Sequence, residues 1–123
     1  MHCLLIILSL LCFVFPQTEY IFTENIQLTD SPNNQKFPEI IINNGIIHLT
    51  WVSISGSSQN VMYSKSIDNG ETFSESIQIN HINNNIISYG QSGPKIKAYN
   101  DIIFITYIDD RTGNWSVYMN ISY

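Results

Sequence analysis

The sequence predicts an all-β protein made of β-propeller blades, each a sheet of four antiparallel strands, and two observations support this fold class. From about residue 20 onward, Ile, Val, Tyr, Phe and Thr occur in short runs separated by clusters of Asn, Gly, Ser and Asp, which is typical of strands joined by turns. The same succession of segments then occurs twice along the chain. Repeats of four short strands in roughly 40–50 residues are typical of propeller blades.

The repeat consists of three pairs of similar segments in one consistent order. The first two pairs lie 56 positions apart and the third 51, because the loop that leads into the second copy is five residues longer. The repeat therefore predicts one whole blade over residues 38–80 and three strands of another over residues 94–123. The matching segments are 38–51 with 94–107, 61–66 with 117–122, and 22–29 with 73–80.

Each predicted strand occupies a fixed place in this repeat. Residues 21–28 match the fourth strand of the whole blade, and we expect them to complete a blade with strands from elsewhere. Residues 46–53 and 102–108 are apolar on both faces, as expected for strands buried between stacked blades. In chain order, the predicted strands cover 21–28, 38–42, 46–53, 60–66, 74–80, 94–99, 102–108 and 115–122.

The first seventeen residues differ from the rest and predict a signal peptide. Residues 3–15 form an apolar run with Ser9 as the only clearly polar residue, and this run is shorter than the roughly 20 residues of a membrane span. We expect cleavage between residues 16 and 19 and secretion of the product; a buried element of the fold and an uncleaved anchor are the alternatives. Cys3 and Cys12 both lie here, so the mature chain, residues 18–123, is expected to fold without disulfides.

The composition limits the possible partners. Asp and Glu total 10 against 5 for Lys and Arg, and the net charge is −5. Nucleic acid is therefore not expected as a partner, because phosphate binding needs a basic patch. No basic amphipathic stretch predicts binding to a membrane surface. His48 falls within a strand and His81 is a lone loop residue, so neither metal nor cofactor is expected.

A segment dense in turn-forming residues lies between the predicted strands 60–66 and 74–80. It carries the pattern Ser-x-Asp-x-Gly-x-Thr-Phe, formed by Ser66, Asp68, Gly70, Thr72 and Phe73. This pattern resembles the Asp-box of bacterial neuraminidase repeats. The resemblance implies that residues 20–123 form about two blades of a six-bladed, sialidase-like propeller, incomplete here. Because a propeller needs at least ~4 blades to close, we expect the remaining blades of a longer chain as partners.

The residue types in this segment predict a structural turn rather than a reactive centre. A tight hairpin needs a positive φ angle, which Gly70 adopts without a steric penalty. Asp68 is expected to accept hydrogen bonds from backbone amides, and the hydroxyls of Ser66 and Thr72 to close the loop. Phe73 is expected to turn inward. A calcium loop is the alternative, but it needs several carboxylates, and only Asp68 and Glu71 are available.

The alternation of strands places candidate ligand groups on the rim opposite the Asp-box. Four loops share that rim, and one of them carries Asp109, Asp110 and Arg111, the only arginine of the chain. These three residues are the binding candidates. The alternative is a structural corner with an acid–arginine pair, a glycine turn at Gly113 and packing of Trp115. The four loops cover residues 30–37, 53–60, 81–93 and 109–115.

The resemblance implies a parent protein that is a glycoside hydrolase of exo-sialidase type, acting on glycans. Sialidases use three arginines to bind the substrate carboxylate, an aspartate as acid/base, and a tyrosine paired with a glutamate as nucleophile. One arginine cannot form this set, and the amino-terminal Arg-Ile-Pro type of motif is not found. We therefore assign no catalytic residue and expect the chain to be inactive by itself. The alternative is a non-catalytic propeller that binds a glycan or a protein.

Overall fold

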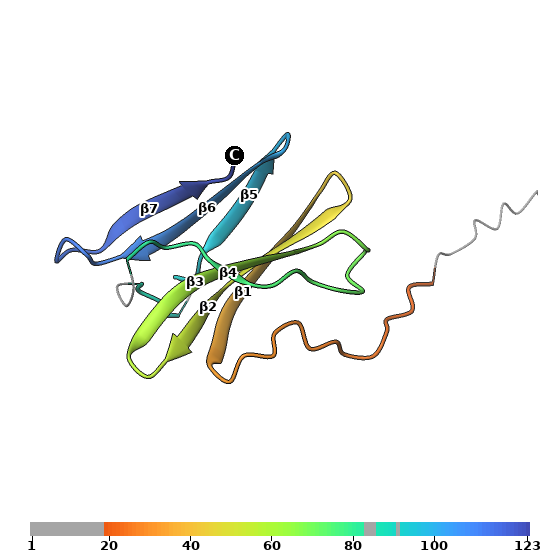
Figure 1. The fold of residues 1–123 in the computed structure, drawn as a ribbon, viewed down its shortest axis with the longest axis horizontal. Coiled ribbons are helices and arrows are strands. Elements are labelled where there is room, and N and C mark those ends of the chain that lie inside the picture. Colours follow the sequence, from red (N-terminus) through yellow and green to blue (C-terminus); the bar gives the residue numbers. More distant parts are fainter. Residues whose placement is uncertain (1–18, 83–85, 91) are drawn as a thin grey trace, which may run out of the picture.

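The computed structural model describes residues 19–82, 86–90 and 92–123, and within them the chain is all-β (Figure 1). The predicted signal peptide over residues 1–17 lies outside the described residues. The seven strands are β1 (Asn34–Asn43), β2 (Ile46–Ser55), β3 (Ser58–Ser66), β4 (Ile77–Gln78), β5 (Lys95–Tyr99), β6 (Ile102–Asp109) and β7 (Ser116–Ile121).

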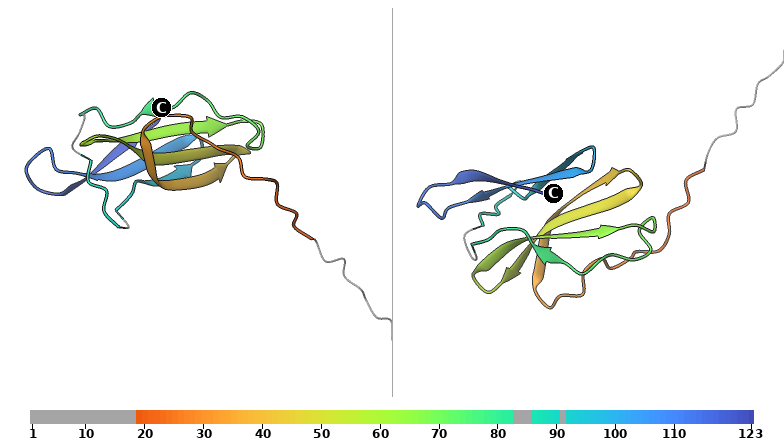
Figure 2. Two further views of the ribbon diagram at one scale, coloured as in Figure 1. Left: turned by 90° about the horizontal axis from the view of Figure 1, so that it is seen from below. Right: turned by 45° about the horizontal axis from the view of Figure 1, so that its top comes forward.

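The strands form two antiparallel sheets in which chain neighbours are hydrogen-bonded neighbours. Sheet 1 has the order β1-β2-β3-β4 and sheet 2 the order β5-β6-β7. The two sheets pack face to face (Figure 2). Between the sheets, β1 lies beside β5, and the Lys95 ammonium lies 2.7 Å from the Glu39 carboxylate. The order within each sheet confirms the predicted succession of strands.

Three segments differ from the predicted strands by more than two residues at an end. Residues 21–28 form no strand, and within the described residues they pair with no other strand. β4 is limited to Ile77–Gln78 within the predicted 74–80. β1 begins at Asn34, before the predicted residue 38, and contains a β-bulge between Lys36 and Glu39, which lets it continue beside β2 past an irregular point.

The core lies between the two sheets. Sheet 1 contributes Val52 and Val61, and the segment that connects the sheets contributes Ile86. Sheet 2 contributes Ile96, Ile103, Ile105 and Tyr107. Residues 48–52 of β2 are all buried, so both faces of this strand are covered, as its sequence predicts.

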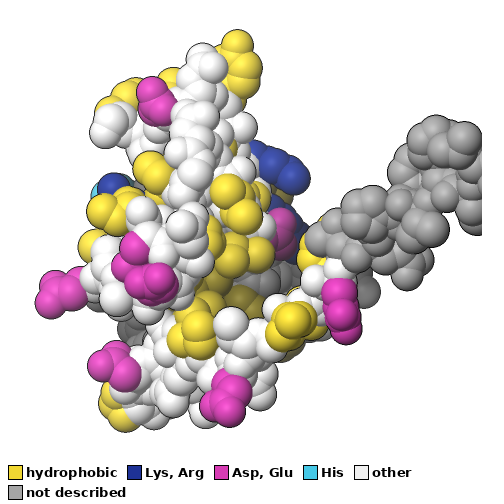
Figure 3. Space-filling view, turned by 90° about the vertical axis from the view of Figure 1, so that its right-hand side faces the viewer, with side chains coloured by type: hydrophobic (Ala, Val, Ile, Leu, Met, Phe, Trp, Pro, Cys, Tyr) yellow, Lys and Arg dark blue, Asp and Glu magenta, His cyan; other side chains and the backbone are white. Residues whose placement is uncertain are grey.

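The two faces of sheet 1 are covered by different parts of the chain. We call the face toward sheet 2 the back face and the opposite one the front face. Trp51 on the front face is only 5% exposed, because residues 26–31 and Phe73 lie beside it. Farther out on this face, on β1, Ile42 is 73% exposed. Hydrophobic side chains are also visible on the end of the molecule that Figure 3 shows.

Candidate functional site at the opposite ends of the sheets

The Asp-box loop, residues 66–73, leaves β3 at one end of sheet 1 and is closed by its own side chains. The Asp68 carboxylate accepts hydrogen bonds from the Thr72 amide at 2.9 Å and the Thr72 hydroxyl at 2.5 Å. The Ser66 hydroxyl donates to Asp68 at 2.7 Å and accepts from the Gly70 amide at 2.9 Å. The φ angle of Gly70 is +92°. The predicted positive φ and the predicted backbone partner of Asp68 are both confirmed.

These hydrogen bonds determine the charge state of the loop. The hydroxyl of Thr72, its amide and the hydroxyl of Ser66 lower the pKa of Asp68 to about 2. At neutral pH the carboxylate is therefore ionised, and both of its oxygens accept bonds from within the loop. A carboxylate engaged in this way holds the turn together and is poorly placed to act as an acid or base.

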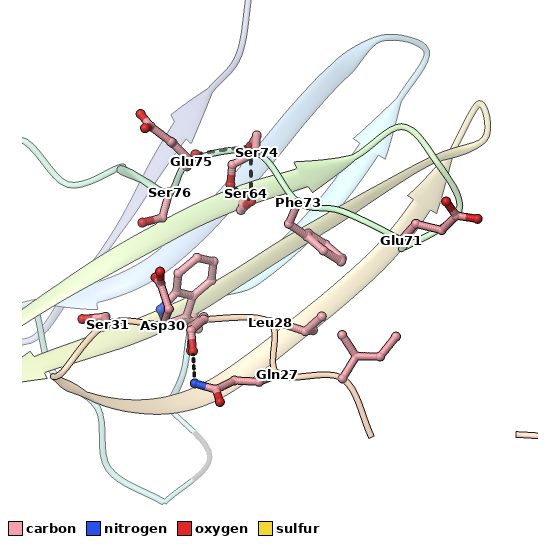
Figure 4. Close-up of a pocket in the computed structure, with 13 residues that line it drawn as sticks. Gln27, Leu28, Asp30, Ser31, Ser64, Glu71, Phe73, Ser74, Glu75 and Ser76 are labelled. Atoms are coloured by element: carbon pink, nitrogen blue, oxygen red, sulfur yellow. Dashed lines mark hydrogen bonds between the residues drawn. The ribbon is translucent and has the colours of Figure 1, made fainter. Parts of the chain in front are cut away.

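A cavity of about 400 Å³ lies on the front face of sheet 1 beside this loop. Figure 4 shows Phe73 projecting from the loop toward the segment that carries Leu28, while Glu71 lies toward the outer end of the loop. Ser64 on β3 donates to the Ser74 carbonyl at 2.6 Å and so fixes the chain that follows the loop. The inward turn of Phe73 thus serves to cover Trp51 together with residues 26–31.

Asp109 and Arg111 form a closed ion pair at the other end of the sheets. The Asp109 side chain is fully buried. One of its oxygens accepts from the Arg111 amide at 2.7 Å and from Nε at 2.9 Å, and the other accepts from Nη2. The Arg111 guanidinium also lies 4.0 Å above the ring of Tyr118, at a distance suited to a cation–π contact.

The charges of this pair stabilise each other. Burial alone would raise the pKa of Asp109, but the hydrogen bonds and the charge of Arg111 outweigh it and hold the pKa below its ordinary value. The same bonds raise the pKa of Arg111. A substrate carboxylate would have to compete with Asp109 for the guanidinium. The acid–arginine pair of the structural-corner alternative is therefore present. The next residue, Asp110, accepts a hydrogen bond at its backbone carbonyl from the Gly113 amide at 2.7 Å.

Two exposed aromatic rings stand beside this corner. Tyr89, from the segment between β4 and β5, stacks on Trp115, from the β6–β7 loop, with ring centroids 5.7 Å apart. Each side chain is 64% exposed. Trp115 therefore does not pack into the corner, which differs from the structural alternative in the sequence analysis. Both loops were expected on this rim, but no sequence pattern pairs one ring with the other.

His48 is a core histidine on the back face of sheet 1. Its Nδ1 lies 2.7 Å from the Tyr63 hydroxyl, and its buried Nε2 has no hydrogen-bond partner in the described part of the chain. Burial, and secondarily the charge of Lys65, lowers the pKa of His48. A neutral, enclosed imidazole of this kind contributes to packing.

Comparisons with known proteins identify no relative. No family model matches the sequence, and no curated protein or solved structure matches it either. Over residues 19–82, 86–90 and 92–123, no group of three or more His, Cys, Asp or Glu residues is placed to hold a metal ion. The same residues contain no helix able to cross a membrane.

Proposed function

We propose that the chain is an exported segment of a sialidase-like β-propeller and that its own contribution is to bind glycan. The observation that carries the binding function is the exposed Tyr89–Trp115 stack on the rim opposite the Asp-box. The parent protein is proposed to be a glycoside hydrolase of exo-sialidase type, from the resemblance of its Asp-box. A non-catalytic glycan-binding propeller is the second candidate, and the engagement of Arg111 by Asp109 favours it.

The way the two sheets pack supports a propeller. Residues 56 positions apart occupy equivalent places, so Leu49 and Trp51 correspond to Ile105 and Tyr107. Leu49 and Trp51 belong to the front face of sheet 1, whereas Ile105 and Tyr107 of sheet 2 pack on the back face of sheet 1. We call the face of sheet 2 that carries Ile105 and Tyr107 its front face, because it is equivalent to the front face of sheet 1. The front face of sheet 2 therefore packs on the back face of sheet 1, and the sheets stack front to back. Such an arrangement repeats a single interface and closes into a ring when the rotation allows it.

The aromatic stack offers a surface that suits a sugar ring. A flat, exposed aromatic face packs against the C–H groups of a sugar while its hydroxyls remain in water, which combines apolar contact with a polar surrounding. The charges beside the stack are already paired, because Asp109 and Arg111 bind each other. We therefore expect recognition by stacking, with Asp110 and the exposed part of Arg111 as polar neighbours on this rim.

Fluorescence titration tests the binding function directly. The chain has two tryptophans, of which Trp51 is buried and Trp115 exposed, so a ligand on the rim should change mainly the Trp115 emission. A panel of sialylated and neutral oligosaccharides is titrated into the protein. Trp115→Phe should remove the signal, and Tyr89→Ala should weaken binding measured by calorimetry. Tyr99→Ala, at a ring 70% exposed on β5 away from the rim, serves as the matched control.

A hydrolysis assay tests the expectation that this chain is inactive by itself. A fluorogenic sialoside should release no fluorophore in the presence of the purified protein, because one arginine, already paired, cannot bind the substrate carboxylate as a triad. Release above that of an Arg111→Ala variant would contradict this expectation.

The binding experiment has its own contrary outcome. Equal glycan affinity in wild type and Tyr89→Ala would remove the support for the aromatic rim.

A further inference from the structure

β7 has a free outer edge at the place where β3 has a partner. In sheet 1, β4 pairs with β3 through Met62–Gln78 and Tyr63–Ile77. In sheet 2, β7 is the last strand, and within the described residues its outer edge pairs with no strand. A free strand edge presents unpaired amides and carbonyls and acts as a template for another strand.

Residues 26–29 correspond to the fourth strand of the repeat, but within the described residues they pair with no third strand. They match residues 77–80 in sequence, 51 positions on. Residues 26–28 line a cavity on the front face of sheet 1 beside Ser64. Residues 77–79 line one on sheet 2 beside Asn120, the counterpart of Ser64. The two segments therefore lie in equivalent places, but only the second is held by a neighbouring strand.

We propose that residues 26–29 of one copy of this chain add as an antiparallel strand to the free edge of β7 of a second copy. The β3–β4 pairing fixes the register when each position is carried across the repeat. Met62–Gln78 and Tyr63–Ile77 become Tyr118–Gln27 and Met119–Ile26. The bond from the Ile79 amide to the Val61 carbonyl, 2.8 Å long, becomes one from Leu28 to Val117.

The occupant is a second copy because the interface inside one chain already shows what fits. Sheet 2 places its front face, which carries Ile105 and Tyr107, on the back face of sheet 1. The two faces left open are the front face of sheet 1, where Ile42 is exposed, and the back face of sheet 2, where Val117 and Met119 are 74% and 53% exposed. Packing one on the other between copies continues the same front-to-back interface. This inference does not depend on glycan binding.

Charged residues are also complementary at the proposed interface between two copies. Within one chain, Glu39 of β1 pairs with Lys95 of β5. These two residues occupy equivalent positions, 56 apart, in the two sheets. When sheet 1 of one copy packs on sheet 2 of the other, Glu39 of the first copy lies toward Lys95 of the second, so no like charges meet there.

A pair of cysteines tests the register. The Ile79–Val61 hydrogen bond makes the adjacent pair Asn60–Asn80 a non-hydrogen-bonded one, with Cα atoms close enough for a disulfide. Its counterpart between copies is Ser116 with Thr29. Thr29→Cys and Ser116→Cys are made in separate full-length chains that also carry Cys3→Ser and Cys12→Ser. The two proteins are then mixed, oxidised and run on a non-reducing gel.

We expect a covalent dimer from the mixture and none from either variant alone. Thr29→Cys mixed with Met119→Cys, which is three residues out of register, is the matched control and should give none. Equal cross-linking in this control, or no dimer in the designed mixture, would overturn the proposal. A disulfide formed within a single chain that carries both substitutions, without intermolecular product, would overturn it as well.

Sedimentation measures the association without cysteines. The wild-type chain should sediment as a concentration-dependent oligomer. Val117→Glu should shift it to the monomer, because this exposed side chain lies on the proposed interface and its replacement leaves the core intact. Thr112→Glu adds the same charge to the exposed β6–β7 loop and should leave the association unchanged. A wild-type chain that stays monomeric at all accessible concentrations would contradict the inference.

Discussion

The Asp-box loop and the β6–β7 loop both enclose an aspartate, but they neutralise it differently. Asp68 is held near the surface by hydroxyls and an amide of its own turn, whereas Asp109 is fully buried and paired with Arg111. The first loop is satisfied by neutral donors that water can replace. The second depends on an opposite charge that water cannot replace. Loss of the bonds to the aspartate should therefore lower stability far more at Asp109 than at Asp68.

Removal of one partner of the buried pair should have the largest effect. Arg111→Met leaves the fully buried Asp109 carboxylate without its counter-charge, and leaving a buried charge unpaired in this way costs about 3 kcal/mol. Urea unfolding should show a lower midpoint with little change in slope. Asp109→Ala, which leaves a partly exposed guanidinium, and the double variant complete a cycle that isolates the pair energy. Additive effects of the two substitutions would show that the pair contributes nothing to stability.

The two glycines with positive φ in these loops should show an intermediate effect. Gly70 and Gly113 have φ angles of +92° and +83°, a region that β-branched residues resist. Gly70→Val and Gly113→Val should each lower the free energy of unfolding by about 2 kcal/mol. Gly70→Val should cost more, because an added Cβ meets Ile47 at 3.4 Å, while the space around Gly113 is open. An equal or reversed order in thermal melts would contradict this difference.

Acid should reveal the hydrogen bonds of Asp68. Since the pKa of Asp68 is lowered from 3.8 to about 2, its ionised form stabilises the fold above pH 3.8, and that stability is lost as the pH falls toward 2. Asp68→Asn should therefore be less stable than wild type at neutral pH and should flatten the stability profile over this range. Glycan affinity per folded molecule should not change. Lost affinity with unaltered melting would place the Asp-box at the binding face.

Titration of His48 should have the smallest effect on stability, and this effect should fall in a separate pH range. Its pKa is lowered from 6.5 by burial, so protonation favours the unfolded chain. Stability should be complete above pH 6.5 and should fall as the pH drops below it. His48→Phe should remove this part of the profile, whereas His81→Gln, at an exposed loop position, should keep it. A profile that is flat between neutral pH and the range of Asp68 would contradict the prediction.

Local chemistry made the Asp-box loop predictable. Its donors and acceptors lie within seven positions of each other, so residue types alone indicated the positive φ of Gly70 and the bonds to Asp68. The strand order was predictable because the repeat shows it twice. The Tyr89–Trp115 stack joins two loops far apart in sequence, and their packing depends on tertiary structure. Residues 21–28 have strand-forming side chains, but a strand also requires a neighbour with free amides and carbonyls.

The contact of β1 with β5 has a consequence for the order of folding events. Each hairpin within a sheet joins residues close in sequence, whereas the Glu39–Lys95 pair and the bond from Asn43 to the Asn100 carbonyl close loops of more than fifty residues. Closing a long loop costs more chain entropy than forming a hairpin, and contacts between distant residues slow folding. The β1–β2–β3 meander is therefore the part able to form first, with the docking of sheet 2 as the slower step.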